Sequence, residues 1–274
     1  KNWDFIIIMI DSLTTSLKGK NALICGSTAG MGKAVSKEFA QMGANVTLFS
    51  RNEEKLKLVI ESMDCLNNQN HRFLVGDFNH PDNIQSVINN DISQGNTYHI
   101  LINNSGGPKG GPIVEAKKSE FLEGFNRHLI CNHILSTALL SGMKSEKYGR
   151  IINIISTSVK QPIEGLGVSN TIRGAVASWA KTFSFEVSKW GITVNNILPG
   201  FTDTGRLASL IESKAKSSNQ TEAEIANEMK NKIPAGRFGT PEETAKAIVF
   251  LASPAAGYIN GVNLAVDGGR LSCI

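Results

Sequence analysis

The feature that most constrains the fold is a glycine-rich turn between an apolar run and an amphipathic run. Asn21–Cys25 is apolar enough for a buried strand, and Gly30–Met42 carries its apolar residues at helical spacing. Glycines between two such elements let the backbone bend tightly and approach a pyrophosphate, whose charge is favoured at a helix N-terminus. The turn therefore predicts a bound dinucleotide. The residues assigned to it are Gly26, Ser27, Thr28, Gly30, Met31 and Gly32.

A nucleoside-triphosphate loop is the main rival interpretation of this turn, because Lys33 follows Gly32. That loop needs an earlier glycine where Ser27 stands, and a Ser or Thr for magnesium where Ala34 stands. A turn used only for packing is the other alternative, and the strand–turn–helix context disfavours it.

Short apolar runs alternate with longer amphipathic runs through the rest of the chain. The predicted strands are Asn21–Cys25, Asn45–Phe49, Arg72–Val75, Ile100–Asn103, Ile151–Ile155, Thr193–Leu198 and Asn263–Val266. The predicted helices are Gly30–Met42, Glu53–Cys65, Pro81–Ser93, Ser119–Lys144, Ser169–Lys189 and Pro241–Ala252. Apolar strands separated by helices indicate a parallel sheet covered on both faces. We therefore expect an α/β fold, a single doubly wound (Rossmann) three-layer domain with a seven-stranded parallel sheet.

The domain is expected to span residues 18–274, after an N-terminal extension of residues 1–17. Phe5–Ile10 in that extension is an apolar run of six residues, which is too short to span a bilayer. The extension is interpreted either as sequence upstream of a start at Met9, or as an extra edge strand or arm.

Residues 203–235 interrupt the alternation with a polar, helical insertion, and Thr221 has the pattern of an N-cap there. An insertion before the last strand lies over the carboxyl ends of the strands, where ligands bind in such sheets. We expect this insertion to shape the substrate pocket.

Composition excludes several classes of function. The net charge of +4 is spread along the chain, so no basic stripe indicates nucleic acid as a partner. The four cysteines are isolated, which fits a reducing compartment and neither a disulfide framework nor a zinc site. His128 and His133 lie five residues apart, on different faces of a helix, so no metal site is expected. No membrane or targeting segment is recognised, and the cytoplasm is the expected location.

The end of the second strand indicates which dinucleotide is bound. An acidic residue there would hold the ribose hydroxyls and disfavour a 2′-phosphate. This chain has Arg51, a good phosphate donor, whereas Glu53 and Glu54 fit the first turn of the next helix. Ala29 offers no second basic group on the glycine turn. NADP(H) is therefore favoured over NAD(H).

Further motifs follow the glycine turn in a specific order. They are Gly76-Asp77-Phe78, Leu101–Gly106, Gly149–Ser156, Asn195–Thr202 and Val266–Gly269. With this set, Lys18–Gly269 resembles the short-chain dehydrogenase/reductases, in particular the β-ketoacyl carrier-protein reductase branch. The resemblance implies a cofactor cleft whose remaining contacts are Asp77, Phe78, Asn104, Ser105, Gly106, Pro199, Gly200 and Thr202. It also implies pairing of the two long helices between subunits of a homodimer or homotetramer.

The resemblance further implies a catalytic Ser, Tyr, Lys and Asn, and this chain departs from three of the four. The corresponding positions hold Ser156, Ser169, Arg173 and His128. The segment around Ser169 looks like a divergent subgroup that lacks the catalytic Tyr and Lys. A serine hydroxyl is far less acidic than a phenol, and an arginine stays charged and cannot relay a proton.

His128 is the new acid–base candidate, because imidazole titrates near neutrality; a buried, hydrogen-bonded histidine is the alternative interpretation. We expect an NADP(H)-dependent oxidoreductase, similar to 3-oxoacyl-[acyl-carrier-protein] reductases, with an atypical active site. Its substrate would be a small carbonyl or alcohol compound, or an acyl thioester. The alternatives are a dinucleotide-binding pseudoenzyme that senses or scaffolds, and an isomerisation or dehydration that uses His128.

Overall fold

The computed structural model of this chain describes residues 15–66 and 68–273. The apolar run Phe5–Ile10 lies outside the described residues, so its role stays a prediction. Leu17, at the end of the predicted extension, is fully buried, and its N–H donates to the Met42 carbonyl over 2.8 Å. The packed domain therefore includes Leu17.

The core of the fold is a sheet of seven parallel strands in the order β3-β2-β1-β4-β5-β6-β7. The strands are β1 (Asn21–Cys25), β2 (Asn45–Ser50), β3 (Arg72–Val75), β4 (Ile100–Asn103), β5 (Gly149–Ile154), β6 (Ile192–Pro199) and β7 (Asn263–Val266). The order reverses direction between β1 and β4, and the carboxyl ends of strands at such a point leave a crevice for a ligand. The predicted doubly wound α/β fold is confirmed.

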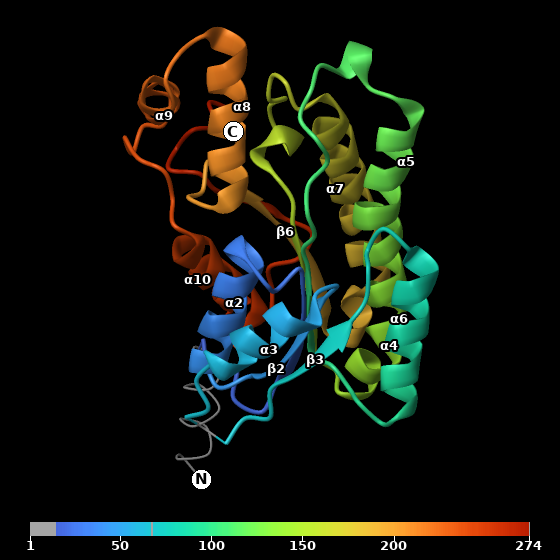
Figure 1. The fold of residues 1–274 in the computed structure, drawn as a ribbon. Coiled ribbons are helices and arrows are strands. Elements are labelled where there is room, and N and C mark those ends of the chain that lie inside the picture. Colours follow the sequence, from blue (N-terminus) through green and yellow to red (C-terminus); the bar gives the residue numbers. More distant parts are fainter. Residues whose placement is uncertain (1–14, 67, 274) are drawn as a thin grey trace.

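Helices cover both faces of the sheet (Figure 1). One face packs on α2 (Gly30–Gln41), α3 (Glu53–Glu61) and α10 (Pro241–Ala252); the other packs on α4 (Pro81–Ser93), α6 (Cys131–Ser145) and α7 (Gly167–Val187). Successive residues of β1 alternate between the faces: Ala22 and Ile24 enter the first apolar cluster, and Leu23 enters the second. Burial on both faces explains why the strands are apolar without alternation.

The predicted helix over Ser119–Lys144 is divided into three parts. α5 (Lys118–Phe125) passes into a π-helical turn at Asn126–Ile130, and α6 follows directly. A π-helical turn widens the helix by one residue, and such turns are frequent at functional sites. His128 lies in this turn, which helical periodicity in the sequence could not reveal.

The helical insertion consists of α8 (Gly205–Ser218) and α9 (Glu222–Asn231). Asn219 separates them with a φ of 55°, and Thr221 accepts a hydrogen bond from the Glu224 N–H as an N-cap. The two helices pack on each other through a small apolar cluster of their own. Figure 1 shows α8 and α9 beyond the end of β6, over the carboxyl ends of the strands.

A ladder of asparagine side chains crosses four strands beneath these carboxyl ends. Asn103 donates to Asn153 over 2.9 Å, Asn153 to Asn196 over 2.8 Å, and Asn196 to Asn263 over 2.8 Å. The same residues are register partners in the sheet. Because buried amides are costly without partners, this ladder fixes the register of β4 to β7.

Within residues 15–66 and 68–273, no helix is long and apolar enough to cross a membrane. The same residues hold no cluster of three or more His, Cys, Asp or Glu side chains placed to bind a metal ion.

Candidate active site

The glycine turn after β1 is held by close backbone contacts. Gly26 has a φ of 57°, and a Cβ there would lie 2.7 Å from the Asn104 carbonyl oxygen. A Cβ on Gly32 would collide with the Gly26 carbonyl oxygen. The Asn104 side-chain amide donates to the carbonyls of Cys25 and Gly26, at 3.2 Å each. Glycine is therefore required at both positions, and Asn104 fixes the turn from β4.

The N-terminus of α2 is open at this turn. In the described structure, no side chain caps it at Ala29, and its first turn has no acidic residue. Gly30 has a φ of 50°, and the nearest atom to a Cβ there is Thr204 Cγ2 at 3.5 Å. Free backbone N–H groups at a helix N-terminus favour an anion. The turn fits the diphosphate of a dinucleotide.

A cavity of about 520 Å³ opens beside the turn, and we call it the main cavity. It is formed by the carboxyl ends of β1, β4, β5 and β6, with α7 and α8 at its sides. Twelve of the predicted site residues line it: Gly26, Gly30, Met31, Asn104, Ser105, Gly106, Ser156, Ser169, Arg173, Pro199, Gly200 and Thr202.

A second cavity of about 320 Å³ shares Gly26, Ser105 and Gly106 with the main cavity, and we call it the side cavity. Four further predicted residues line it: Thr28, Arg51, Asp77 and Phe78. The two cavities lie side by side at the carboxyl ends of the strands, and we call them together the cleft, with Arg51 in the side cavity and Ser169 in the main cavity.

The side cavity also holds Arg127, which sequence reasoning missed. Its Nε donates to Asn79 Oδ1 over 3.0 Å, and one terminal nitrogen donates to the Gly106 carbonyl over 3.2 Å. Asp77 in turn accepts hydrogen bonds from the backbone and side chain of Asn79. Arg127 lies in the π-helical turn, and no motif in the sequence distinguishes it from a surface arginine.

Three predicted residues line neither cavity. Ser27 is fully buried, and its Oγ has no hydrogen-bond partner among the described residues. Gly32 packs under the turn. His128 is 2% exposed, and its Nδ1 lies 2.7 Å from Ser105 Oγ. His128 therefore contacts a residue of the cleft without reaching the cleft itself.

The surroundings of His128 hold it in the neutral form. Burial lowers the pKa of the imidazole well below its usual value, and the positive charges of Arg173 and Arg127 lower it further. Its Nε2 is buried with no hydrogen-bond partner in the described part of the chain. A neutral imidazole is a poor general acid, but it can release a proton from one nitrogen while it accepts a proton at the other.

The other three residues at the expected catalytic positions line the main cavity. Ser156 follows β5, is half-buried, and its Oγ accepts from the Ser158 N–H over 3.1 Å. Ser169 lies in the first turn of α7, and Arg173 follows one turn later. A terminal nitrogen of Arg173 donates to the Ile154 carbonyl over 3.1 Å.

Arg173 is 9% exposed. Burial, with a smaller effect of the nearby Arg206, lowers the pKa of its guanidinium to about 10. Arg173 thus remains charged at neutral pH. Arg206, at the start of α8, also lines the main cavity and was missed, because the insertion had no recognisable motif.

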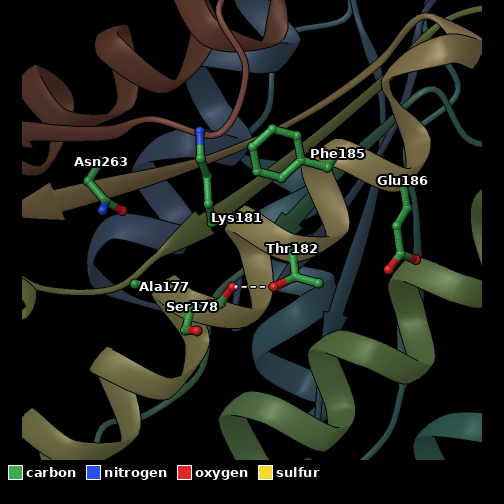
Figure 2. A pocket seen from close by; sticks show the side chains of 7 residues that line it. All are labelled: Ala177, Ser178, Lys181, Thr182, Phe185, Glu186 and Asn263. Carbon is green, nitrogen blue, oxygen red and sulfur yellow. Dashed lines mark hydrogen bonds between the residues drawn. The ribbon is translucent and has the colours of Figure 1, made fainter.

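A further pocket of about 490 Å³ lies on the outward face of α7, and it shares no lining residue with the cleft. Figure 2 shows side chains from successive turns of α7 around it, among them Lys181 and Phe185, with Asn263 from β7 at its edge. Phe185 is 71% exposed, and the Lys181 ammonium lies 4.9 Å from its ring centre. This face is separate from the cleft.

Comparison with known proteins agrees with this geometry. A family described as enoyl-(acyl carrier protein) reductase matches residues 26–270. The 3-oxoacyl-[acyl-carrier-protein] reductase FabG of Vibrio cholerae is 31% identical over 254 residues, which cover 93% of this chain and 98% of that protein.

Two solved structures have the same fold. The L-sorbose reductase of Gluconobacter frateurii, in complex with NADPH and L-sorbose, superposes with a TM-score of 0.88 and 28% identity, over 95% of this chain and 99% of that one. YwfH, an NADPH-dependent reductase involved in bacilysin biosynthesis, gives a TM-score of 0.87 and 26% identity, over 93% and 99%. With its parallel sheet, its glycine turn and these relatives, the chain belongs to the short-chain dehydrogenase/reductase family of NAD(P)-dependent oxidoreductases.

Proposed function

We propose that this protein is an NADP(H)-dependent oxidoreductase that acts on a carbonyl or alcohol substrate, similar to 3-oxoacyl-[acyl-carrier-protein] reductases, with an atypical active site. One observation carries the proposal. Ser156, Ser169 and Arg173 line the same cavity as the glycine turn and the segment Pro199–Thr202. Hydroxyls and a positive charge therefore face the space in which a dinucleotide and a carbonyl compound would meet.

The cleft favours NADP(H) over NAD(H). Arg51 lies at the exposed end of the side cavity beside Thr28 and Ser50, whose hydroxyl oxygens are 3.4 Å apart. An arginine and two hydroxyls suit a 2′-phosphate. The carboxylate of Asp77, the nearby acidic group, is already engaged by Asn79. The L-sorbose reductase and YwfH are both described as NADPH proteins, which agrees with this preference.

When bound, NADPH would supply the hydride to the carbonyl carbon. In this chain Ser156 and Ser169 would donate hydrogen bonds to the carbonyl oxygen, where negative charge develops. Arg173 adds a permanent positive charge beside them, which favours anionic species in the cavity. Arg173 does not supply the proton, because its guanidinium stays protonated at working pH.

The proton for the new hydroxyl group needs another route. Ser105 lines the cavity and contacts His128. A neutral imidazole can give up a proton at Nδ1 as it takes one at Nε2. We assign the pair a relay role: Ser105 gives its proton to the alkoxide and takes one from His128 Nδ1, while a buried water molecule at Nε2, an atom with no partner among the described residues, gives the ring a proton in exchange. That water then takes a proton from solvent. The relay leaves both residues unchanged after each reduction.

A dinucleotide-binding pseudoenzyme is the second candidate function. Among the described residues that line the main cavity, the ionisable side chains are those of Arg173 and Arg206, and no Tyr, Lys, His, Asp, Glu or Cys is present to act as a general acid. A sensor or scaffold would need the cofactor cleft, but it would not need a general acid beside the nicotinamide end of that cleft. Under this candidate the protein binds NADPH and leaves it unoxidised with every carbonyl compound.

The substrate class follows the relatives, whose names give acyl-carrier-protein thioesters for FabG and L-sorbose for the sorbose reductase. A small carbonyl compound or an acyl thioester would enter beside α8. We further propose a homodimer or homotetramer that uses the outward face of α7, where Phe185 is exposed. The cytoplasmic location stays a prediction from the sequence.

Kinetics with a carbonyl panel test the proposed function. Purified protein with NADPH is given ketones, 3-oxoacyl thioesters and 3-oxo acids, and loss of NADPH is followed by absorbance. Substrate-dependent oxidation that disappears in Gly30→Val supports the enzyme. Tight NADPH binding with no oxidation across the panel would favour the pseudoenzyme, and no NADPH binding would reject both.

A further inference from the structure

We infer that Arg173 and Arg206 together form a binding site for a carboxylate, so that the substrate of the proposed reductase is an oxo acid or hydroxy acid. That the bound acid is a substrate rests on the proposed function. That a carboxylate binds here rests on the geometry of the two arginines. It adds Arg206, a residue of the insertion, to the groups that select the substrate.

The two guanidinium groups converge on one point of the main cavity. A Cβ built on Gly107 would lie 3.7 Å from a terminal nitrogen of Arg173 and 3.8 Å from a terminal nitrogen of Arg206. Position 107 carries only a hydrogen, so space remains between the two groups. A carboxylate has two oxygens that accept from such planar donors, and one can serve each arginine.

Each arginine is held by one backbone carbonyl and has donors to spare. Arg173 donates to the carbonyl of Ile154, and Arg206 donates to the carbonyl of Pro108 over 2.6 Å. A guanidinium has five N–H donors. One terminal nitrogen of Arg173 binds the Ile154 carbonyl, and the other lies beside Gly107 with no hydrogen-bond partner among the described residues. Unused donors at the wall of the main cavity can bind an anion.

The positive charge at this site is uncompensated. The main cavity is lined by two arginines and, within the described residues, by no aspartate or glutamate. The two like charges repel, which contributes to the lowered pKa of Arg173. Neutralising them with an anion would remove a cost that the folded protein otherwise bears.

The start of α8 adds to the same potential. Gly205 begins the helix, Thr204 makes no side-chain cap there, and the described first turn has no acidic residue. The helix dipole therefore adds positive potential next to Arg206. Part of the remaining wall is apolar, which suits an acid with a hydrocarbon body. The apolar residues there include Ile155, Ile163, Leu166, Phe201, Leu207 and Leu210.

Two sources could supply the anionic oxygens: a substrate carboxylate, or the diphosphate of the cofactor. We assign the site to the substrate, because the open N-terminus of α2 already provides for the diphosphate. If the site binds the substrate carboxylate, loss of Arg206 weakens the binding of the acid. If it binds the diphosphate, loss of Arg206 weakens the binding of NADPH. The experiment measures both affinities.

The test uses acetoacetate and its neutral methyl ester as probes. Calorimetric titrations are done on the free protein and on its NADP⁺ complex, in a buffer low in chloride. Arg206→Ala and Arg173→Lys are compared with the wild type. Lys216→Ala is the matched control, because Lys216 lies on the same helix and pairs with Glu212 on the surface. NADPH affinity is measured for every variant.

We expect the wild type to bind acetoacetate at least about tenfold more tightly than the ester, because one hydrogen bond to a charged group contributes about this much to affinity. Arg206→Ala and Arg173→Lys should each weaken acetoacetate by about fivefold or more and reduce the preference over the ester. Lys216→Ala should keep the wild-type preference. Arg206→Ala should also leave NADPH affinity within about twofold, because the diphosphate binds at α2.

Equal binding of acid and ester, or an acid preference that survives Arg206→Ala, would overturn the inference. So would a variant that loses NADPH affinity and keeps the acid preference, which would assign the arginines to the cofactor. Failure of the proposed reductase looks different: acetoacetate would still bind the free protein in an Arg206-dependent manner while no NADPH is bound or oxidised.

Discussion

The imidazole Nδ1 of His128 lies 2.7 Å from Ser105 Oγ. The first residue stands where the family resemblance implies an asparagine, and the second belongs to the segment Leu101–Gly106 that lines the cleft. Their hydrogen bond joins the π-helical turn to the cleft. We propose that the two residues act as one unit.

Loss of either partner should therefore cost about the same as loss of both. We expect Ser105→Ala and His128→Ala each to lower kcat by about tenfold or more, in the range of general acid–base catalysis. The double variant should fall little further, since residues of one relay act as a unit. Steady-state kinetics with unchanged NADPH affinity would check this. If the decrease in kcat of the double variant equalled the product of the two single decreases, the relay would be contradicted.

The buried neutral state of His128 should make the fold sensitive to acid. Its pKa is lowered in the folded protein, whereas an unfolded histidine takes up a proton near pH 6.5. The unfolded chain then binds more protons, so stability is full above about pH 6.5 and decreases as the pH falls below it. His99, whose pKa is lowered by burial and by Lys20, contributes in the same direction.

Urea unfolding at neutral pH and at about pH 5.5 measures this dependence. His128→Asn should lose less stability over that interval than the wild type does, because one of the two buried histidines is gone. His133→Asn, at an exposed position of α6, is the control and should behave as the wild type. An unchanged pH dependence in His128→Asn would show that this ring is protonated in the folded state.

The asparagine ladder should contribute to stability through its central member. Asn153→Ala leaves the amide of Asn103 and the carbonyl oxygen of Asn196 without their partner. Unpaired buried polar groups cost about 1–3 kcal/mol each, so the two groups give an expected loss of about 2–6 kcal/mol in the free energy of unfolding. Asn90→Ala, on the exposed face of α4, should change it by less than about 1 kcal/mol. Similar small effects at both positions would contradict the structural role of the ladder.

Arg51 should determine the choice of dinucleotide. Arg51→Ala is expected to weaken NADPH binding by about tenfold to a hundredfold, the worth of a charge-assisted pair, and to leave NADH binding nearly unchanged. Fluorescence titration of both cofactors measures this. Lys57→Ala removes one positive charge from the surface of α3 and should change neither affinity. If Arg51→Ala weakened the binding of NADPH and of NADH equally, Arg51 would not be the residue that selects the 2′-phosphate.

The strands and the glycine turn could be predicted because local residues determine them. β1, β3, β4 and β7 have the predicted bounds. For β1 and β4 the reason is that a strand buried on both faces must be a short apolar run. Gly26 and Gly32 could be assigned to the turn because glycines spaced in this way between a strand and a helix are themselves a signature. These features can be recognised from neighbours in the sequence.

The remaining parts of the site depend on neighbours in space. Arg206 reaches Gly107 across about a hundred positions of the chain, and nothing in the insertion marks it. The π-helical turn around His128 changes the helix by a single residue, which an apolar pattern does not record. The ladder through Asn153 needs the strand register, and four separate asparagines in a sequence do not show it.

Hydride transfer from a labelled cofactor tests the central claim most directly. The protein is incubated with NADPH that carries deuterium at the transferable position, and with ketones, 3-oxoacyl thioesters and 3-oxo acids. Mass spectrometry then follows the alcohol products, with Gly30→Val as the control that cannot seat the diphosphate. The proposed oxidoreductase predicts deuterium on the carbinol carbon of at least one product with the wild type, and none with Gly30→Val. A wild-type protein that binds NADPH and transfers deuterium to none of them would contradict it.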